Sequence, residues 1–119
     1  MKSTRSNPDF LNGVPEMLIL HLLSGRPSHG YELVQAIRRS TGGTLEFGEG
    51  CVYPILHRLE AEGFVTGRRE SVAGRSRVVY RVTPKGERRL TETVGAWHRV
   101  VGAVGNVLQG GEQGRPALA

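Results

Sequence analysis

The polar residues of the segment 52–62 form the set best suited to binding chemistry in this 119-residue sequence. Apolar residues recur there at the spacing of one helical face, namely Val52, Ile55, Leu56 and Leu59. At about 100° per residue, the opposite face carries Pro54, His57, Arg58 and Ala61, with Tyr53 at its edge. A guanidinium, an imidazole and an aromatic hydroxyl beside small residues suit the groove of a duplex, because arginine binds phosphate oxygens and guanine edges in a bidentate manner.

Basic residues are concentrated in one segment of the chain. The formal net charge is +5, and residues 50–89 alone hold nine basic residues against four acidic ones, so the remainder sums to zero. Fourteen of the sixteen basic residues are arginines. This distribution indicates a polyanionic partner. The alternative, a solvated basic face that maintains solubility, is typical of scattered charge.

Catalytic and metal-binding sets are missing from the sequence. Asp9 is the only aspartate, and it lies in a polar N-terminal stretch, so a Ser-His-Asp triad is not expected. The four histidines show no paired metal-ligand spacing, and Gly48-x-Gly50 lacks the third glycine of a dinucleotide loop. We therefore expect no enzyme, no metal and no cofactor.

The single cysteine, Cys51, excludes an internal disulfide. Two interpretations of it stay open: a small packed apolar residue, or a redox sensor whose pKa is lowered at a helix N-terminus. No apolar run approaches the roughly 20 residues of a membrane-spanning helix, and no signal-peptide core follows Met1. The sequence thus predicts a cytoplasmic protein.

Three helices are expected in the first half of the chain, before residue 63. The first covers residues 14–23, with Pro15 in its first turn, and the second covers residues 30–40, with Ser28 available as its cap. The third is the segment 52–62, in which Pro54 is expected within the first turn, because an interior proline breaks helical hydrogen bonding.

A β-hairpin and a long last helix complete the expected fold. Residues 64–70 and 77–83 alternate as strands around an arginine-rich turn at 71–76, and Thr83-Pro84 caps a helix over residues 85–108. The order predicts a mainly α protein with a small β-hairpin, a winged helix-turn-helix with a long C-terminal dimerisation helix. The expected divisions are a flexible arm at 1–12, a DNA-binding domain at 13–83, the dimerisation helix at 84–109 and a disordered tail at 110–119.

The last helix carries more apolar surface than one small core can cover. Its apolar residues are spaced 4, 3, 4, 3 and 4 apart, as in a heptad seam: Leu90, Val94, Trp97, Val101, Val104 and Leu108. The simplest partner is the same helix of a second copy. The alternative, a helix folded back on its own domain, stays open. Trp97 is either the anchor of such an interface or a stacking platform for a planar hydrophobic effector.

Several motifs make the sequence resemble the PadR-type transcriptional regulators. They are LNGVPEMLIL at 11–20, HGYEL at 29–33, GCVYPILHRLEAEG at 50–63, GRSR at 74–77 and YRVTPKG at 80–86. Cys51 and Val79 depart from the family pattern. The resemblance implies a homodimer, usually a repressor, that binds an imperfect palindromic operator and releases it when a small molecule or other signal acts. The length of the last segment is similar to that of the short subfamily with a single C-terminal helix.

The resemblance also implies which residues contact DNA. On the recognition helix these are Tyr53, Pro54, His57 and Arg58, and on the wing they are Arg75 and Arg77. Arg58 is the candidate for reading a base and Tyr53 for binding a phosphate, whereas Tyr31 is either a core residue or a phosphate contact. The rival hypothesis is a winged-helix module that binds protein without specific DNA binding. An enzyme is a more distant alternative.

Overall fold

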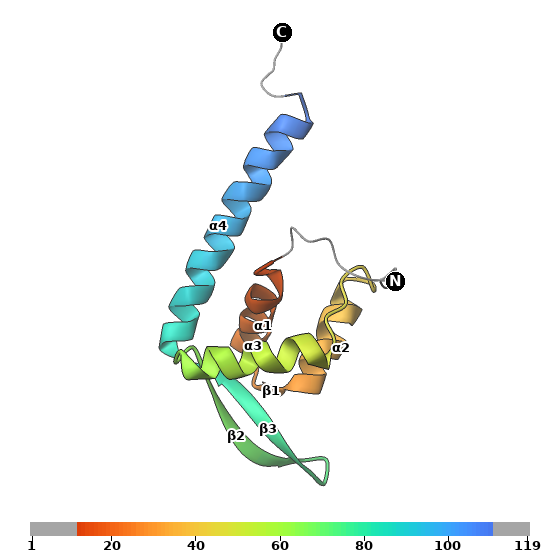
Figure 1. The fold of residues 1–119 in the computed structure, drawn as a ribbon, viewed down its shortest axis with the longest axis vertical. Helices are drawn as coiled ribbons and strands as arrows, with labels where there is room; N and C mark the ends of the chain where they lie inside the picture. Colours follow the sequence, from red (N-terminus) through yellow and green to blue (C-terminus); the bar gives the residue numbers. More distant parts are fainter. Residues whose placement is uncertain (1–11, 111–119) are drawn as a thin grey trace.

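The computed structural model describes residues 12–110. The expected arm and tail, apart from their innermost residues 12 and 110, lie outside the described residues, as does Asp9. The elements in chain order are α1 Val14–Gly25, β1 Ser28–His29, α2 Gly30–Ser40, α3 Glu49–Ala61, β2 Val65–Val72, β3 Arg75–Val82 and α4 Pro84–Leu108. Figure 1 shows α1, α2 and α3 gathered in one body, with the β2–β3 hairpin projecting from it and α4 running away on the opposite side. The predicted fold class, mainly α with a small β-hairpin, is confirmed.

The core lies between the first three helices and the base of the hairpin. Each of the helices contributes a stripe of apolar side chains that the sequence periodicity had indicated. The largest fully buried side chains are Ile19, Leu20, Leu33, Ile37, Val52, Leu56, Leu59 and Val65. Because these positions recur at helical spacing, burying them fixes which face α3 turns outward.

The hairpin is longer and tighter than the sequence analysis expected. β2 and β3 pair in antiparallel register from Val65 with Val82 to Val72 with Arg75, which leaves a two-residue turn. Ala73 and Gly74 form this turn with φ of 52° and 80°, the positive values that a type I′ turn requires. The expected six-residue turn at 71–76 was therefore wrong.

A two-residue strand, β1, adds a third strand that the sequence analysis did not predict. It pairs with β3 through Ser28 opposite Tyr80 and His29 opposite Val79, giving the order β1-β3-β2. A strand of two residues is too short to show the alternation of apolar and polar residues by which strands are recognised in a sequence. It ties the start of α2 to the base of the wing.

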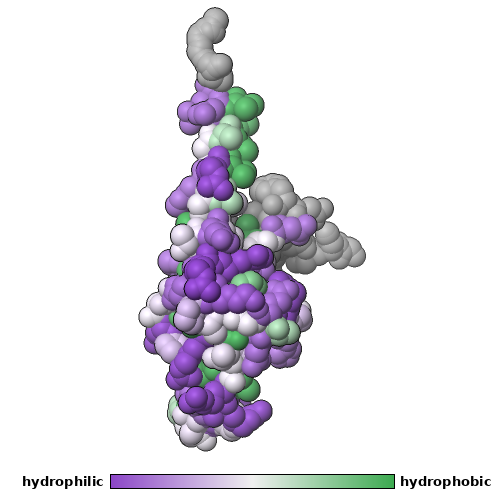
Figure 2. Space-filling view, turned by 90° about the vertical axis from the view of Figure 1, so that its left-hand side faces the viewer, coloured by the Kyte–Doolittle hydropathy of each residue, from purple (hydrophilic) through white to green (hydrophobic). Residues whose placement is uncertain are grey.

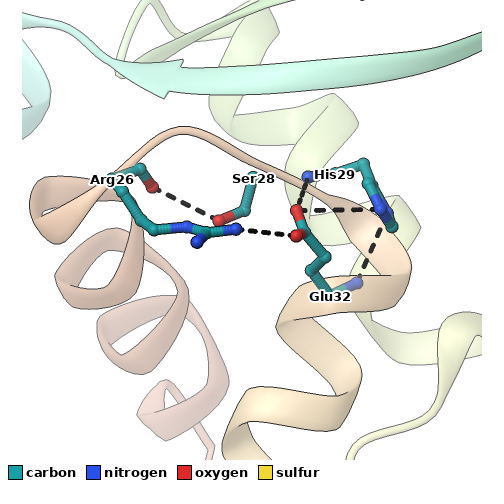
Figure 3. Close-up of polar contacts among 4 residues, drawn as sticks. All are labelled: Arg26, Ser28, His29 and Glu32. Carbon is teal, nitrogen blue, oxygen red and sulfur yellow. Dashed lines mark hydrogen bonds and ion pairs between the residues drawn. The ribbon is translucent and has the colours of Figure 1, made fainter. Parts of the chain in front are cut away.

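The cap of α2 is His29, and the expected cap Ser28 was wrong. Nδ1 of His29 accepts a hydrogen bond from the Glu32 amide at 3.4 Å, and Oε1 of Glu32 accepts one from the His29 amide at 3.0 Å. Figure 3 shows this reciprocal capping box. Ser28 instead donates its hydroxyl to the Arg26 carbonyl at 3.3 Å, and Arg26 pairs with Glu32 at 2.7 Å. Pairing with β3 places Ser28 one residue too early to cap.

α3 begins three residues before the expected start, after the cap residue Gly48. Pro54 is therefore the sixth residue of the helix rather than part of its first turn, and that expectation was wrong. Proline lacks the N–H that would bond the carbonyl four residues earlier, at Gly50. Pro54 and Gly50 both lie on the exposed side of α3, where water is available to that carbonyl.

α4 starts where it crosses the base of the wing. As expected, Thr83 caps it, and its Oγ1 accepts a hydrogen bond from the Gly86 amide at 3.0 Å. The same hydroxyl donates to the Gly63 carbonyl at 2.7 Å, and the Thr83 amide donates to the Phe64 carbonyl at 3.0 Å. A Cβ added at Gly86 would collide with that Phe64 carbonyl oxygen. The close crossing requires glycine.

We expect Gly86→Ala to lower the free energy of unfolding by about 1 to 3 kcal/mol, because backbone rather than a flexible side chain must move. Gly102→Ala on the exposed part of α4 is the matched control, since a Cβ there meets open space. It is expected to stabilise by up to about 1 kcal/mol through helix propensity. Urea denaturation measures both, and equal effects of the two substitutions would contradict the crossing geometry.

Candidate nucleic-acid interface

The exposed face of α3 is the centre of the candidate site. Val52, Leu56 and Leu59 are buried, so the opposite side of the helix, with Pro54 and His57, faces outward. Tyr53 lies half-buried at the edge next to the wing, as the helical arithmetic predicted. The centre of this outward side carries no acidic residue. The exposed carboxylates of α3 are those of Glu49 and Glu60, and Glu60 accepts a hydrogen bond from the Gly67 amide of the wing at 3.1 Å.

Tyr53 is held by the start of α2. Its ring lies so close to Gly30 that a Cβ on this glycine would collide with the ring and its hydroxyl. The Tyr53 and His57 rings are tilted at 46° with centroids 6.5 Å apart. Gly30 therefore allows the phenol to pack at the N-terminus of α2, beside the groove-facing side of α3.

An open cleft of about 250 Å³ separates α3 from the wing. It is lined by residues from β1, α3 and both wing strands: His29, Tyr53, His57, Arg69, Ser76, Arg77, Val78 and Tyr80. Arg69 Nη1 donates to Ser76 Oγ at 3.2 Å across the two strands. Three of the predicted contacts, Tyr53, His57 and Arg77, thus meet at one cleft, and Arg69 joins them although the sequence analysis did not select it.

The wing supplies cationic side chains that no carboxylate neutralises. Arg81 pairs with Glu70 at 2.8 Å, whereas Arg68, Arg75 and Arg77 have no ion-pair partner within residues 12–110. Arg75 follows the tight turn at the tip of the hairpin. The arginines at the tip are therefore free to meet an external anion.

Arg58 has neighbours that the sequence analysis missed. Its Nη1 lies 3.1 Å from Oε1 of Glu16 and 3.6 Å from Oε1 of Glu62. Glu16 is buried on α1, where a carboxylate among Met17, Ile19 and Leu20 was the sequence signal that a cation must lie nearby. Arg58 thus sits on the flank of α3 that faces α1 rather than beside the wing.

Two tyrosines differ in their environments. Tyr31 is exposed and its hydroxyl accepts from Gln35 Nε2 at 3.2 Å, so it is not a core residue. Tyr80 is buried, and burial together with Glu60 and Tyr53 raises its pKa. Tyr80 therefore stays a neutral phenol in the floor of the cleft.

Burial raises the pKa of the Cys51 thiol, the opposite of what a thiolate sensor needs. We expect iodoacetamide to alkylate Cys51 at pH 8 more slowly than it alkylates free cysteine, and the rate to reach the ordinary value in denaturant. Alkylation faster than that of free cysteine would contradict this environment.

α4 divides into a packed and an exposed part. Leu90 is buried in the core of its own chain and Val94 packs against that core. The exposed apolar part comprises Trp97, Val100, Val101, Val104, Val107 and Leu108. Figure 2 shows these hydrophobic residues gathered along one side of the upper helix, above a largely hydrophilic body. The predicted seam therefore starts inside the domain and leaves it after Val94.

Trp97 lies 39% exposed beside a hollow of about 290 Å³ between α4 and the start of α1. The lining is mainly apolar and consists of Asn12, Gly13, Val14, Met17, Thr93, Ala96, Trp97 and Val100.

Within residues 12–110, no group of three or more metal-ligating side chains occurs. No helix in this described range is long and apolar enough to cross a bilayer.

Helices α1 to α3, the outward face of α3 and the arginine-bearing hairpin together define a winged helix-turn-helix protein. The model of the transcriptional regulator PadR-like family matches residues 19–92, and this chain belongs to that family of transcriptional regulators.

Known proteins share both sequence and fold with the chain. The transcriptional regulator Rv3488 of Mycobacterium tuberculosis is 38% identical over 84 residues, which cover 71% of this chain and 76% of that protein. The crystal structure of a PadR-like regulator from Bacillus cereus has a TM-score of 0.76 and 33% identity, covering 87% of this chain and 99% of that one. A PadR family regulator from Eggerthella lenta has a TM-score of 0.74 and 28% identity over 86% of this chain and 88% of that one.

Proposed function

We propose that the chain is a homodimeric transcriptional repressor in the cytoplasm that binds a palindromic DNA operator and releases it on a signal. One observation carries the DNA-binding part of this proposal. Tyr53 and His57 of α3 border the same cleft as Arg69 and Arg77 of the wing, so one duplex can engage both elements. Membership in a family of transcriptional regulators supports the same role.

On this proposal α3 enters the major groove and the wing lies along the adjacent backbone or minor groove. Pro54 and His57 face base edges, Tyr53 bonds a phosphate, and Arg75 and Arg77 neutralise phosphates. Arg58 remains our candidate for reading a guanine, and it must then exchange its contact with Glu16 for a base.

Dimerisation is proposed along the exposed apolar part of α4. Val107 and Leu108 are 75% and 79% exposed, and such a stripe at heptad spacing is typical of a helix that packs on a partner helix. In the proposed division, residues 13–83 bind DNA and residues 84–109 pair two copies, with Leu90 and Val94 anchoring α4 to its own domain.

Selection of binding sites from a pool of random duplexes tests the proposal. We expect an imperfect palindrome whose half-sites lie about 10 base pairs, or about 34 Å, apart. If the selected duplexes share only one half-site without a second, inverted copy, the result would contradict the dimer. Retention of no duplex at all would favour a winged-helix module that binds protein.

Signal input is proposed at the hollow beside Trp97, where a planar hydrophobic effector can stack on the indole. The chain has one tryptophan, so its emission reports this position alone. We expect planar hydrophobic dyes to quench Trp97 emission and to lower operator affinity over the same concentration range. Quenching without loss of affinity would make Trp97 a packing residue and direct the search for the signal elsewhere.

A further inference from the structure

The carboxylate of Glu16 contacts two helices that have different tasks in the proposed function. Oε1 lies 3.1 Å from Nη1 of Arg58 on α3, and Oε2 lies 3.0 Å from Nε of Arg89 on α4. Within residues 12–110, Glu16 is the only carboxylate with ion pairs to both helices. Its side chain is 10% exposed, whereas those of Arg58 and Arg89 are 47% and 43% exposed.

We propose that Glu16 is a positioning residue that sets the orientation of the recognition helix α3 relative to α4. One oxygen of the carboxylate pairs with a cation on α3 and the other with a cation on α4. A shift of α3 relative to α4 therefore strains at least one of the two ion pairs. The carboxylate is largely shielded from water, so it depends on these cations more than they depend on it.

A second contact between α3 and α4 does not involve Glu16. Lys85 Nζ donates to the carbonyl of Glu62, just beyond the end of α3, at 2.8 Å. This bond keeps the C-terminal end of α3 attached to α4 without Glu16. Loss of the bridge therefore lets α3 pivot about its C-terminal end, which moves its N-terminal half the most.

This inference rests on the proposed function, because the orientation matters only if α4 pairs two copies and α3 reads DNA. In such a dimer, α4 sets where the second copy lies and Glu16 sets how α3 is held against α4. The same carboxylate also competes with DNA for the Arg58 guanidinium. A shift of α4 that weakens the Glu16–Arg89 ion pair therefore also changes how strongly Glu16 holds Arg58.

Spin-label distances in the DNA-free protein test the bridge independently of DNA binding. Nitroxides are placed on the exposed positions Glu49→Cys and Asn106→Cys, after Cys51→Ser and dilution with unlabelled chain. We expect Glu16→Gln to broaden the distance distribution, and Arg89→Gln to do the same, with Arg89→Lys restoring a narrower one. Glu62→Gln is the matched control: it removes one negative charge beside Arg58 and leaves in place the backbone carbonyl that accepts a hydrogen bond from Lys85 on α4.

Each result decides the inference. An unchanged width in Glu16→Gln overturns it, and so does equal broadening in Glu62→Gln, which would assign the effect to charge alone. Glutamine retains an acceptor oxygen and both arginines are half-exposed, so the variant is expected to fold. If circular dichroism shows that it does not, Arg89→Gln and Arg89→Lys decide the same question.

Operator spacing gives the functional readout. Inserting one base pair between half-sites rotates them out of phase, and wild type is expected to discriminate against it. Glu16→Gln is expected to lose about 2- to 30-fold of this discrimination, and Glu62→Gln is expected to keep it. If wild type itself shows no spacing preference, the proposed palindrome fails, while the label distances still decide the bridge.

Discussion

The double substitution Val101→Asp with Val104→Asp is expected to give monomers with unchanged helix content. Burying a valine contributes about 1.5 to 3 kcal/mol, and about half of that is available here because the side chains are 47% and 50% exposed in the single chain. Four such side chains in a dimer contribute about 3 to 6 kcal/mol. The dissociation constant of the dimer should then rise at least about 100-fold.

The matched control is Arg99→Gln with Asn106→Asp, which changes the net charge by the same amount on the opposite face of α4. Sedimentation equilibrium should find this control dimeric, and operator binding should fall only in the valine variant. A valine variant that remains dimeric at micromolar concentration would remove α4 from the interface.

The second large effect is expected from the wing, where Arg75→Ala with Arg77→Ala removes two unpaired cations per chain. In a dimer this removes four phosphate contacts, so the slope of log K against log salt should fall by about 3.6. Binding should weaken by about 1 to 4 kcal/mol at all sequences alike, because phosphate contacts carry no base information.

Arg88→Ala with Arg99→Ala removes the same charge from exposed positions on α4 and serves as the control. It should leave the salt slope nearly unchanged. If the wing variant alters base preference while its slope of log K against log salt stays unchanged, the roles that we assign to the wing and the recognition helix are reversed.

Periodicity predicted the helices because each one buries a stripe of apolar residues, and the spacing of such a stripe is visible in the local sequence. Of the apolar positions of α3, Val52, Leu56 and Leu59 are buried and Ile55 is half-buried, and the outward side carrying Pro54 and His57 follows from them. Thr83 and Pro84 likewise marked the start of α4 through local chemistry alone.

The features that the sequence did not predict depend on tertiary pairing. β1 exists only because Ser28 and His29 lie against β3, and this pairing moves the cap of α2 to His29. The tight turn at Ala73 and Gly74 requires a positive φ at an alanine, which propensity disfavours. The nearer partner of Arg58, Glu16, lies on α1, so helical periodicity within α3 did not show that Arg58 is paired across to another helix.

The salt dependence of binding to random duplex tests the central claim most directly. Fluorescence anisotropy of a labelled duplex, titrated with the protein between 50 and 200 mM salt, gives log K against log salt. The expected result is a linear fall with a slope of about −3.6 or steeper, since four wing arginines in a dimer each displace counterions. An affinity independent of salt, or no binding at 50 mM, would contradict a DNA-binding regulator.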